Sequence, residues 1–320
     1  MTTGTLCLLG GSGFVGRHLA ARLSTRGWRV RIPTAHRDRH RDLLVLPGVQ
    51  LVAADIHDPA TLRALCADCD AVINLVGILN EPGHRGRGFQ RAHVELAEKL
   101  ISACLASGVT RLLQMSALNA DAGEARSHYL RTKGRAEDLL HAAAAQGLQV
   151  TSFRPSVIFG PGDSFFNRFG ALLKITPWLF PLACPEALFA PVYVGNVVAA
   201  FVHALHTPAC IGQCYALCGP KIYTLRELVE FTARTLDLRR EIVGLSRGLS
   251  SLQAHLLEYF PGKPFSRDNY WSLQKASVCT QPFPNIFGIV PDSIEAIVPT
   301  YLAHQNQRGR YAAYRSRRMQ

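Results

Sequence analysis

Three glycines near the start of the chain constrain its fold more than any other feature. Gly10, Gly13 and Gly16 follow a short apolar run (5–9) and precede a stretch with apolar residues at helical spacing (14–24). A strand, a glycine-rich turn and a helix in this order are typical of a dinucleotide-binding domain, because glycines permit the tight turn and the close approach of a pyrophosphate. The helix N-terminus adds N–H groups and a positive dipole. A glycine turn that binds no ligand is the alternative.

Short β-rich runs alternate with longer helical runs through the first half of the chain. The predicted strands are 5–9, 28–32, 49–53, 71–76, 111–115 and 150–153. We expect helices between them, the longest from Phe89 to Ser107, where Gly108 ends it. Strands that alternate with helices form βαβ units, and their parallel sheet is covered on both faces. The sequence therefore predicts an α/β fold: a Rossmann-type doubly wound parallel sheet with a smaller mixed C-terminal lobe.

The alternation loosens after Pro155, where prolines and aromatic residues become frequent. A helix over 197–205 and a strand over 213–217 are expected to return to the sheet, and Thr224 and Glu227 form a capping box that begins another helix. We therefore expect residues 1–217 to form the nucleotide-binding domain, with a lobe insertion near 161–190. Residues 218–320 are expected to form a substrate or interaction lobe that ends in a basic tail.

The residues expected to bind a dinucleotide follow the first three predicted strands, because ligands of open α/β sheets bind at the carboxyl ends of the strands. In the glycine turn they are Gly10, Gly13, Phe14, Val15 and Gly16. After the second strand they are Thr34, His36 and Arg37, and after the third they are Asp55 and Ile56. Asp55 is placed to reach the adenine edge.

The end of the second strand predicts which nicotinamide cofactor is bound. NAD-specific domains carry an acid there that binds the ribose 2′-hydroxyl, but this chain has Pro33 and Thr34. The basic residues that follow are His36, Arg37, Arg39 and Arg41. An absent acid and a positive field favour a 2′-phosphate, and so NADP(H) over NAD(H). Against this, Asp38 lies within the cluster, and exposed basic residues are commonly only solvated.

Several longer stretches resemble a known family. They are Val-Ile-Asn-Leu-Val-Gly-Ile-Leu at 72–79, Arg-Leu-Leu-Gln-Met-Ser-Ala-Leu at 111–118, Phe-Arg-Pro-Ser-Val-Ile-Phe-Gly at 153–160 and Pro-Phe-Ser-Arg-Asp-Asn at 264–269. With them the chain resembles the extended and atypical short-chain dehydrogenases/reductases, which include NAD-dependent epimerases and dehydratases. The subgroup that it resembles contains relatives of the NAD(P)H-binding accessory subunit of mitochondrial complex I. The resemblance runs from about Thr5 to Tyr301.

The resemblance implies a catalytic trio of Ser116, Tyr129 and Lys133. In the superfamily, a serine after the fifth strand and a Tyr-x-x-x-Lys on the next helix transfer a proton beside the nicotinamide, and a spacing of four places Tyr129 and Lys133 on one helix face. A phenol is a poor base at neutral pH because its ordinary pKa is about 10, but a nearby ammonium favours the phenolate. Ser116 would bind the substrate oxygen, and Lys133 would also hold the nicotinamide ribose. Tyr-x-x-x-Lys also arises by chance on amphipathic helices.

The resemblance adds further cofactor residues and one departure. Leu75, Val76 and Gly77 stand at the end of the fourth strand, near the nicotinamide-side ribose, and Pro155 and Ser156 follow the sixth, with Arg154 beside them. Active members often carry an asparagine in the helix after the fourth strand, where this chain has His93. A lone histidine is more often structural than a proton relay. Nucleotide binding is commonly retained in this branch even where turnover is not known.

Metal and nucleic acid are not expected partners. The nine cysteines are predicted to be buried thiols, not a disulfide framework, and neither Cys66/Cys69 nor Cys210/Cys214/Cys218 has the second half of a zinc site. The net charge of +12 comes with no helix-turn-helix, zinc finger or RNA-binding motif. The basic tail (308–318) is interpreted as solubilising, with a membrane contact as the alternative.

No run of apolar residues is long enough to span a bilayer, so we expect a protein of the cytosol or an equivalent reducing compartment. A peripheral position at the inner membrane surface stays open. The apolar segment 175–181 is predicted to be lobe core; the mouth of a lipophilic substrate site and a membrane contact are the alternatives. Two functions follow: an NAD(P)(H)-dependent oxidoreductase or epimerase-like enzyme with a small, lipophilic substrate, or a non-catalytic nucleotide-binding subunit or assembly factor of a respiratory or quinone-synthesis complex.

Overall fold

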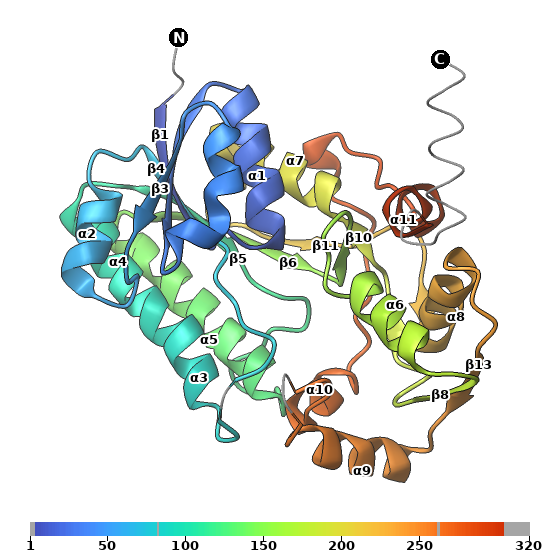
Figure 1. Cartoon of the computed structure of the whole chain (residues 1–320). Helices are drawn as coiled ribbons and strands as arrows, with labels where there is room; N and C mark the ends of the chain where they lie inside the picture. The colour runs from blue at the N-terminus through green and yellow to red at the C-terminus, as the bar shows by residue number, and fades with distance from the viewer. Residues whose placement is uncertain (1–3, 82, 261–262, 304–320) are drawn as a thin grey trace, which may run out of the picture. The chain divides into compact units, whose positions relative to one another are not determined.

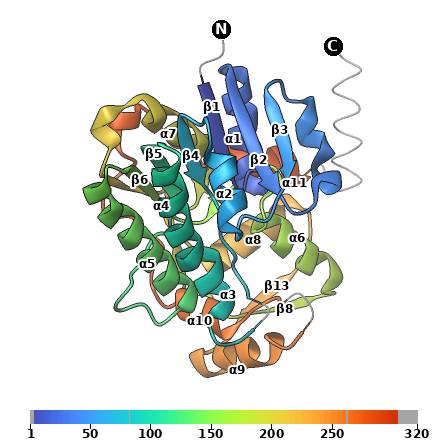
Figure 2. The ribbon, with the colours of Figure 1, turned by 90° about the vertical axis from the view of Figure 1, so that its left-hand side faces the viewer.

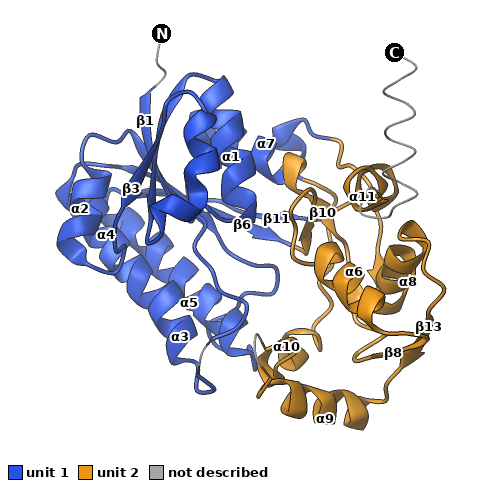
Figure 3. Cartoon of the chain, in the orientation of Figure 1, with its two compact units in different colours: residues 1–155, 197–217, 284–289 blue, residues 156–196, 218–283, 290–320 orange. Residues whose placement is uncertain are grey.

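The computed structural model describes residues 4–81, 83–260 and 263–303 (Figure 1). The basic tail expected at 308–318 lies outside these ranges. The chain forms two compact units, of which unit 1 comprises residues 1–155, 197–217 and 284–289, and unit 2 comprises 156–196, 218–283 and 290–320 (Figure 3). The insertion expected near 161–190 falls inside the first segment of unit 2. The return of residues 284–289 to unit 1 has no counterpart in the sequence prediction.

A seven-stranded parallel sheet lies at the centre of unit 1. Its strands are β1 (Gly4–Leu9), β2 (Trp28–Thr34), β3 (Val49–Ala53), β4 (Ala71–Asn74), β5 (Arg111–Met115), β6 (Gln149–Pro155) and β11 (Cys214–Leu217). They are arranged in the order β11-β6-β5-β4-β1-β2-β3. The chain builds outwards from β1 to β3 on one side and to β11 on the other, so the predicted Rossmann-type doubly wound α/β fold is confirmed.

Helices cover both faces of this sheet (Figures 1 and 2). On one face lie α2 (Pro59–Cys66), α4 (Leu96–Ala106) and α5 (His128–Ala142), and on the other lie α1 (Phe14–Thr25) and α7 (Val194–His206). The core under α2, α4 and α5 includes Val72, Leu100, Leu112 and Leu140, all 0% exposed. Both faces of the central strands are therefore buried, which explains why these strands are continuous apolar runs.

The helix predicted over 89–107 forms, but it is not a regular α-helix throughout. It begins with α3 (Arg87–Phe89), continues as a π-helical turn (Gln90–Glu95), and becomes α4. π-helical turns inside helices occur frequently at functional sites. This one places His93 in the protein interior, where it is 3% exposed.

Unit 2 is a mixed lobe of helices and short strand pairs. Its helices are α6 (Phe166–Ile175), α8 (Leu225–Thr235), α9 (Arg247–Leu257), α10 (Arg267–Ser272) and α11 (Ile294–Leu302). Its strands are β7 (Ile158–Phe159), β8 (Leu179–Leu182), β9 (Leu188–Phe189), β10 (Val192–Tyr193), β12 (Tyr223–Thr224) and β13 (Glu241–Gly244), paired as β10-β7, β12-β9 and β13-β8. The predicted capping box is present, since Glu227 N donates to Thr224 Oγ1 at 3.2 Å and Thr224 N donates to Glu227 Oε2 at 2.7 Å.

The prediction that all cysteines are buried thiols is wrong in two respects. Cys218 and Cys279 form a disulfide within unit 2. They are 61 residues apart, so no local pattern could have paired them. Cys214 is a free but exposed thiol. Cys184 is free and half-buried, and the prediction holds for the cysteines that are both free and buried, which are Cys7, Cys66, Cys69, Cys104 and Cys210.

The apolar segment 175–181 is only partly lobe core. Phe180 is 8% exposed and packs in the core of unit 2. Ile175 and Trp178, however, are 78% and 83% exposed, and Leu179 is 50% exposed. The prediction of a buried segment is therefore wrong for these three side chains. Ile175 ends α6, Trp178 precedes β8, and Leu179 lies on the exposed face of β8, whose side chains alternate between two faces.

Candidate functional site

The glycine turn links β1 to α1 as predicted. Gly10 has a φ of +75°, in the left-handed region that favours glycine. Gly13 N donates to Gly10 O at 3.0 Å, and a Cβ atom on Gly16 would lie only 2.3 Å from that oxygen. Gly13 is the N-cap of α1 and has no side chain that could cap the helix. The N–H groups of the first turn, which includes Phe14 and Val15, are thus left for an anion. The turn fits a pyrophosphate.

The chain after β2 carries the basic residues that bear on cofactor choice. Thr34 Oγ1 accepts a hydrogen bond from His36 N at 3.3 Å. A 3₁₀ helix follows at Arg37–Val45, and both His36 and Arg37 are exposed at its start. Arg41 forms an ion pair with Asp38. Arg37 is therefore the exposed guanidinium nearest in sequence to the end of β2.

Arg17 lies beside the glycine turn and was not among the site residues predicted from the sequence. It lies in the first turn of α1, directly after Gly16, and its Nε donates to Ser12 O at 3.0 Å. Its guanidinium also forms an ion pair with Asp42 and lies 3.0 Å from His40 Nδ1. These contacts hold a positive charge beside the glycine turn. Its position next to the last glycine was the signal that could have identified it.

Asp55 and Ile56 follow β3. Asp55 is exposed, and its Oδ1 accepts a hydrogen bond from His57 N at 2.9 Å. This turn leads to Asp58, the N-cap of α2. Ile56 is half-buried against the core under α2. Asp55 therefore stabilises the strand–helix turn, and its contact with adenine stays a prediction.

Ser116 lies directly after β5, where its N donates to Phe153 O at 2.8 Å. The side chain is 3% exposed. Among the residues that the structure describes, Ser116 Oγ has no hydrogen-bond partner. A buried hydroxyl without a partner costs about 1–3 kcal/mol. This orphaned donor is the observation in unit 1 that points most directly to a bound ligand.

Tyr129 and Lys133 lie one turn apart on α5, which begins where Ser127 Oγ accepts a hydrogen bond from Leu130 N at 3.3 Å. The ammonium of Lys133 donates to Val76 O at 3.0 Å and to Met115 O at 2.9 Å. It thus ties α5 to the chain that follows β4 and to the end of β5, one residue before Ser116. Burial lowers the pKa of Lys133 to about 8, and the carboxylate of Glu137 opposes this shift.

The segment after β4 joins the glycine turn to Lys133. Leu75 N donates to Leu9 O at 3.0 Å, and a Cβ atom on Gly10 would lie 3.1 Å from the carbonyl carbon of Leu75. A Cβ atom on Gly77 would lie 3.0 Å from Lys133 Nζ. Backbone therefore approaches backbone at Gly10 and approaches the ammonium at Gly77. The structure brings together Gly10, Leu75, Val76, Gly77, Lys133 and Ser116, six of the predicted site residues.

His93 has two hydrogen bonds that join the β4–α3 loop to α5. Its Nδ1 lies 2.8 Å from Thr132 Oγ1, and its Nε2 accepts from Ile78 N at 3.4 Å. Thr132 Oγ1 donates to His128 O at 2.8 Å, so we assign the proton of the imidazole to Nδ1. Burial, with a smaller effect of the Lys133 ammonium, lowers the pKa of His93 to about 2. A histidine that stays neutral is a positioning residue, not a proton relay, and its ring packs against Tyr129 at 5.7 Å between centroids.

Glu81 is a second residue that the sequence analysis missed. It is 6% exposed, and its carboxylate accepts hydrogen bonds from Gly86 N and Gly88 N, both at 2.6 Å. It therefore folds the loop between β4 and α3 back on itself, ahead of the π-helical turn. No motif surrounds it, and its role depends on contacts that only the folded loop provides.

Pro155 and Ser156 stand at the passage from unit 1 to unit 2. Pro155 ends β6, and its carbonyl oxygen accepts from Leu118 N at 3.0 Å. Ser156 begins unit 2, where its hydroxyl donates to Ser277 O at 2.7 Å. Their contact with the cofactor stays a prediction.

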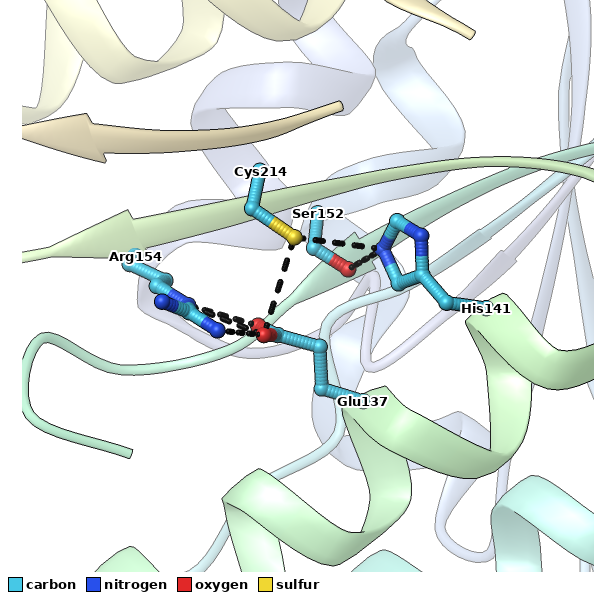
Figure 4. Close-up of polar contacts among 5 residues, drawn as sticks. All are labelled: Glu137, His141, Ser152, Arg154 and Cys214. Atoms are coloured by element: carbon cyan, nitrogen blue, oxygen red, sulfur yellow. Dashed lines mark hydrogen bonds and ion pairs between the residues drawn. The ribbon is translucent and has the colours of Figure 1, made fainter. Parts of the chain in front are cut away.

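Arg154 belongs to a separate polar cluster on the side of α5 that faces β6 and β11 (Figure 4). Its guanidinium forms an ion pair with Glu137, whose side chain is 2% exposed. His141 Nε2 lies 2.9 Å from Ser152 Oγ and 3.4 Å from Cys214 Sγ. Cys214 is exposed as a residue, but its sulfur is partly desolvated against this cluster; this desolvation and the Glu137 carboxylate raise the pKa of Cys214 to about 11, which keeps the thiol protonated and poorly nucleophilic. Arg154 therefore anchors α5 to the sheet, and its contact with a ligand stays a prediction.

The described ranges hold neither a metal-binding cluster nor a membrane-spanning helix. Across residues 4–81, 83–260 and 263–303, no three histidine, cysteine or acidic side chains are grouped so that they could hold a metal ion. No helix in this part of the chain is both long and apolar enough to cross a membrane.

Comparison with known proteins agrees with this geometry. The model of the NAD dependent epimerase/dehydratase family matches residues 6–218. A subunit 9 of the NADH dehydrogenase [ubiquinone] 1 alpha subcomplex, mitochondrial, from Arabidopsis thaliana is 32% identical over 229 residues, which are 70% of this chain and 56% of that protein. A ceramide reductase from Caulobacter vibrioides is 30% identical over 208 residues, 64% of this chain and 62% of that protein. The match thus spans little more than half the length of either relative.

A solved structure shows the same fold. The dTDP-glucose 4,6-dehydratase of Streptomyces venezuelae, solved as a double mutant with NAD bound, superposes with a TM-score of 0.72. It is 18% identical, and the superposition covers 95% of this chain and 98% of that one. At this identity the likeness shows the fold alone. The family match covers the glycine turn, Ser116, Tyr129 and Lys133. Because it spans more than half of the chain, it shows that the chain belongs to the NAD dependent epimerase/dehydratase family, a nicotinamide dinucleotide-binding branch of the extended short-chain dehydrogenases/reductases.

Proposed function

We propose that the chain is an NADP(H)-dependent oxidoreductase that interconverts a carbonyl and an alcohol, with Ser116, Tyr129 and Lys133 as its catalytic residues. The observation that carries the proposal is the buried hydroxyl of Ser116, which has no partner among the described residues. It lies one residue beyond Met115, whose carbonyl oxygen accepts a hydrogen bond from Lys133. A substrate oxygen would satisfy this hydroxyl.

Each residue has a distinct part in carbonyl reduction. When bound, NADPH would supply the hydride that the carbonyl carbon accepts. Tyr129 donates its phenolic proton to the carbonyl oxygen, so that the product is an alcohol and the tyrosine is left as a phenolate. Ser116 donates a hydrogen bond to the same oxygen as negative charge develops on it. The ammonium of Lys133 stabilises the phenolate, because two of its three N–H groups are fixed on Val76 O and Met115 O and its charge cannot move away.

Residues around the glycine turn would hold the cofactor. The first turn of α1 would bind the pyrophosphate, and Thr34, His36, Arg37, Asp55 and Ile56 would surround the adenosine. We propose NADP(H) because no carboxylate stands at the end of β2, and because Arg37 and Arg17 supply guanidinium groups for a 2′-phosphate. NADPH should bind at least about tenfold more tightly than NADH, and Arg37→Glu should remove most of that difference. Arg22→Glu, on the exposed last turn of α1, is the matched control.

We propose a substrate with an alkyl chain. The similarity to a ceramide reductase supports a carbonyl or hydroxyl group on a lipophilic compound. The test is NADPH oxidation with long-chain 3-oxo compounds, for the wild type, Tyr129→Phe and Tyr259→Phe. Tyr129→Phe should lower turnover by about 10²–10⁴-fold while NADPH binding, read from its fluorescence, stays unchanged. Tyr259→Phe removes an exposed hydroxyl and should change neither. Turnover that survives Tyr129→Phe would exclude the mechanism.

A second candidate is a non-catalytic nucleotide-binding subunit or assembly factor of a respiratory complex. The similarity to the Arabidopsis NADH dehydrogenase subunit favours it. It predicts that the chain binds NADPH, turns over none of the carbonyl compounds, and migrates with a larger assembly when membranes are solubilised and separated on a native gel. NADPH binding does not distinguish the two candidate functions, because both require it. Turnover that depends on Tyr129 is expected only of the enzyme.

A further inference from the structure

Helix α9 of unit 2 exposes apolar side chains to solvent. Leu249, Leu252, Leu256, Tyr259 and Phe260 are 52%, 54%, 59%, 71% and 59% exposed. Their spacings of three, four, three and one place them along one stripe of the helix and the turn that follows it. We call these five residues the α9 apolar face. Large exposed apolar patches on folded proteins mark interaction surfaces.

The opposite side of α9 holds the helix on unit 2. Ser250 and Ala254 are buried there. Ser250 Oγ accepts a hydrogen bond from Cys184 N at 3.0 Å, and Gln253 Nε2 donates to Pro181 O at 3.4 Å. Glu258 is 5% exposed and forms an ion pair with a side chain of α10. The usual arrangement of a surface helix is therefore reversed, with small and polar residues inward and leucines outward.

The charges of α9 indicate what covers this face. The one acidic residue in the sequence between 246 and 260 is Glu258, and its side chain is buried and forms an ion pair. Arg247 and His255 are exposed, and Lys263 follows in the next described segment. Among the described residues of this segment, the apolar face is thus flanked by the guanidinium of Arg247 and the ammonium of Lys263, while the carboxylate of Glu258 is turned inward. A second copy of the chain would bring like charges together, whereas an anionic lipid surface would complement them.

A second apolar group lies at the same end of unit 2. Figures 1 and 2 show β8 and α9 close together at the end opposite α11. The exposed side chains of this second group are Ile175 at the end of α6, Trp178 just before β8 and Leu179 at the start of β8. Tryptophan and tyrosine side chains favour the boundary between lipid head groups and acyl chains, because each has an apolar ring and a polar group.

We propose that the α9 apolar face docks unit 2 on the surface of an anionic lipid membrane. The helix lies in the plane of the interface, with its leucines and Phe260 among the upper acyl carbons and Arg247 and His255 at the head groups. This inference goes beyond the proposed function and does not depend on it, because it needs neither nucleotide nor turnover.

The test is co-sedimentation of the full chain with phosphatidylcholine vesicles, with and without roughly one third phosphatidylglycerol. We expect binding to the anionic vesicles, little to the neutral ones, and release at high salt. The double variant Leu252→Asp/Leu256→Asp should bind at least about tenfold more weakly. Val290→Asp is the matched control, because this valine is 89% exposed but lies outside α9. Equal thermal unfolding midpoints would establish that all three proteins are folded.

Other results would overturn the proposal. Absence of binding to anionic vesicles by the folded wild type would do so, as would equal binding by the double variant. If the wild type is a dimer in solution and the double variant a monomer, the face is an interface between copies of the chain. Gly13→Asp should abolish NADPH binding but leave vesicle binding intact, so a failure of the proposed function remains distinguishable from a failure of this inference.

Discussion

The contact between Gly16 and the glycine turn gives the sharpest prediction. In Gly16→Ala, the new Cβ atom would lie 2.3 Å from Gly10 O and 2.5 Å and 2.6 Å from the Cα and carbonyl carbon of Gly11. All three are backbone atoms, which cannot rotate away as the end of a side chain can. The start of α1 must therefore move by roughly 1 Å before the methyl group fits, since such contacts are normally longer than about 3.2 Å.

The expected destabilisation follows from this displacement. Overpacking in a tightly packed interior typically costs 1–3 kcal/mol, and we expect about 3 kcal/mol here because no clashing atom can yield alone. For a chain of 320 residues this corresponds to a fall of roughly 4–5 °C in the unfolding midpoint. Differential scanning calorimetry and denaturant unfolding of the apo protein measure both quantities.

Gly13→Ala is the control for this prediction. Gly13 has a φ of −76°, which any residue adopts, and its Cβ atom would meet only Gly10 O, at 3.2 Å. We expect a loss of less than about 1 kcal/mol, consistent with an alanine N-cap. Because the methyl group would point where a pyrophosphate must approach, NADPH affinity should nevertheless fall about tenfold or more. Unfolding midpoints within 1 °C of the wild type for Gly16→Ala would refute the packing argument.

Three further predictions concern α5 and unit 2. The pKa of Lys133 is lowered to about 8 in the folded chain, from about 10.5 when unfolded, so the unfolded state binds more protons between these pH values and stability should rise with pH by about 3 kcal/mol. The pH dependence of unfolding, measured as wild type minus Lys133→Met, should show this rise, and a flat difference would contradict it. Glu137→Gln removes the charged partner of the half-exposed Arg154 guanidinium and should lower the free energy of unfolding, measured in urea, by about 2 kcal/mol. Asp138→Asn, at the neighbouring exposed position, should change it little. Reduction of the Cys218–Cys279 disulfide frees a loop of 61 residues and should lower stability by about 4 kcal/mol, which unfolding with and without dithiothreitol measures; an unchanged midpoint would contradict the entropic argument.

The sequence predicts the features whose causes are local. The β1–turn–α1 unit follows from glycine positions and apolar spacing, and the capping box at Thr224 and Glu227 follows from two residues three apart. The order of strands and helices predicted the parallel sheet, because a connection through a helix leaves few other topologies. The positions of Ser116 and Lys133 after β5 and on α5 followed from the same pattern together with the family resemblance.

The features that the sequence does not predict depend on contacts between distant segments. The hydrogen bonds of His93 reach both the chain after β4 and Thr132 on α5, so neither its neutral state nor the π-helical turn can be read from residues 89–107 alone. The ammonium of Lys133 has its partners 57 and 18 residues away. Glu81 and the disulfide are similar cases. Local periodicity has no information about such pairs.

The passage of the chain back and forth between its two units has a consequence for how it folds during synthesis. Unit 1 is completed by residues 284–289, where the ring of Phe287 packs against Phe153 and Tyr215 at 6.0 Å and 4.9 Å between centroids. The nucleotide-binding half is therefore still incomplete when the ribosome has made residues 1–217. Neither unit can be cut out as a continuous gene fragment, and both must reach their final packing only when nearly the whole polypeptide has emerged.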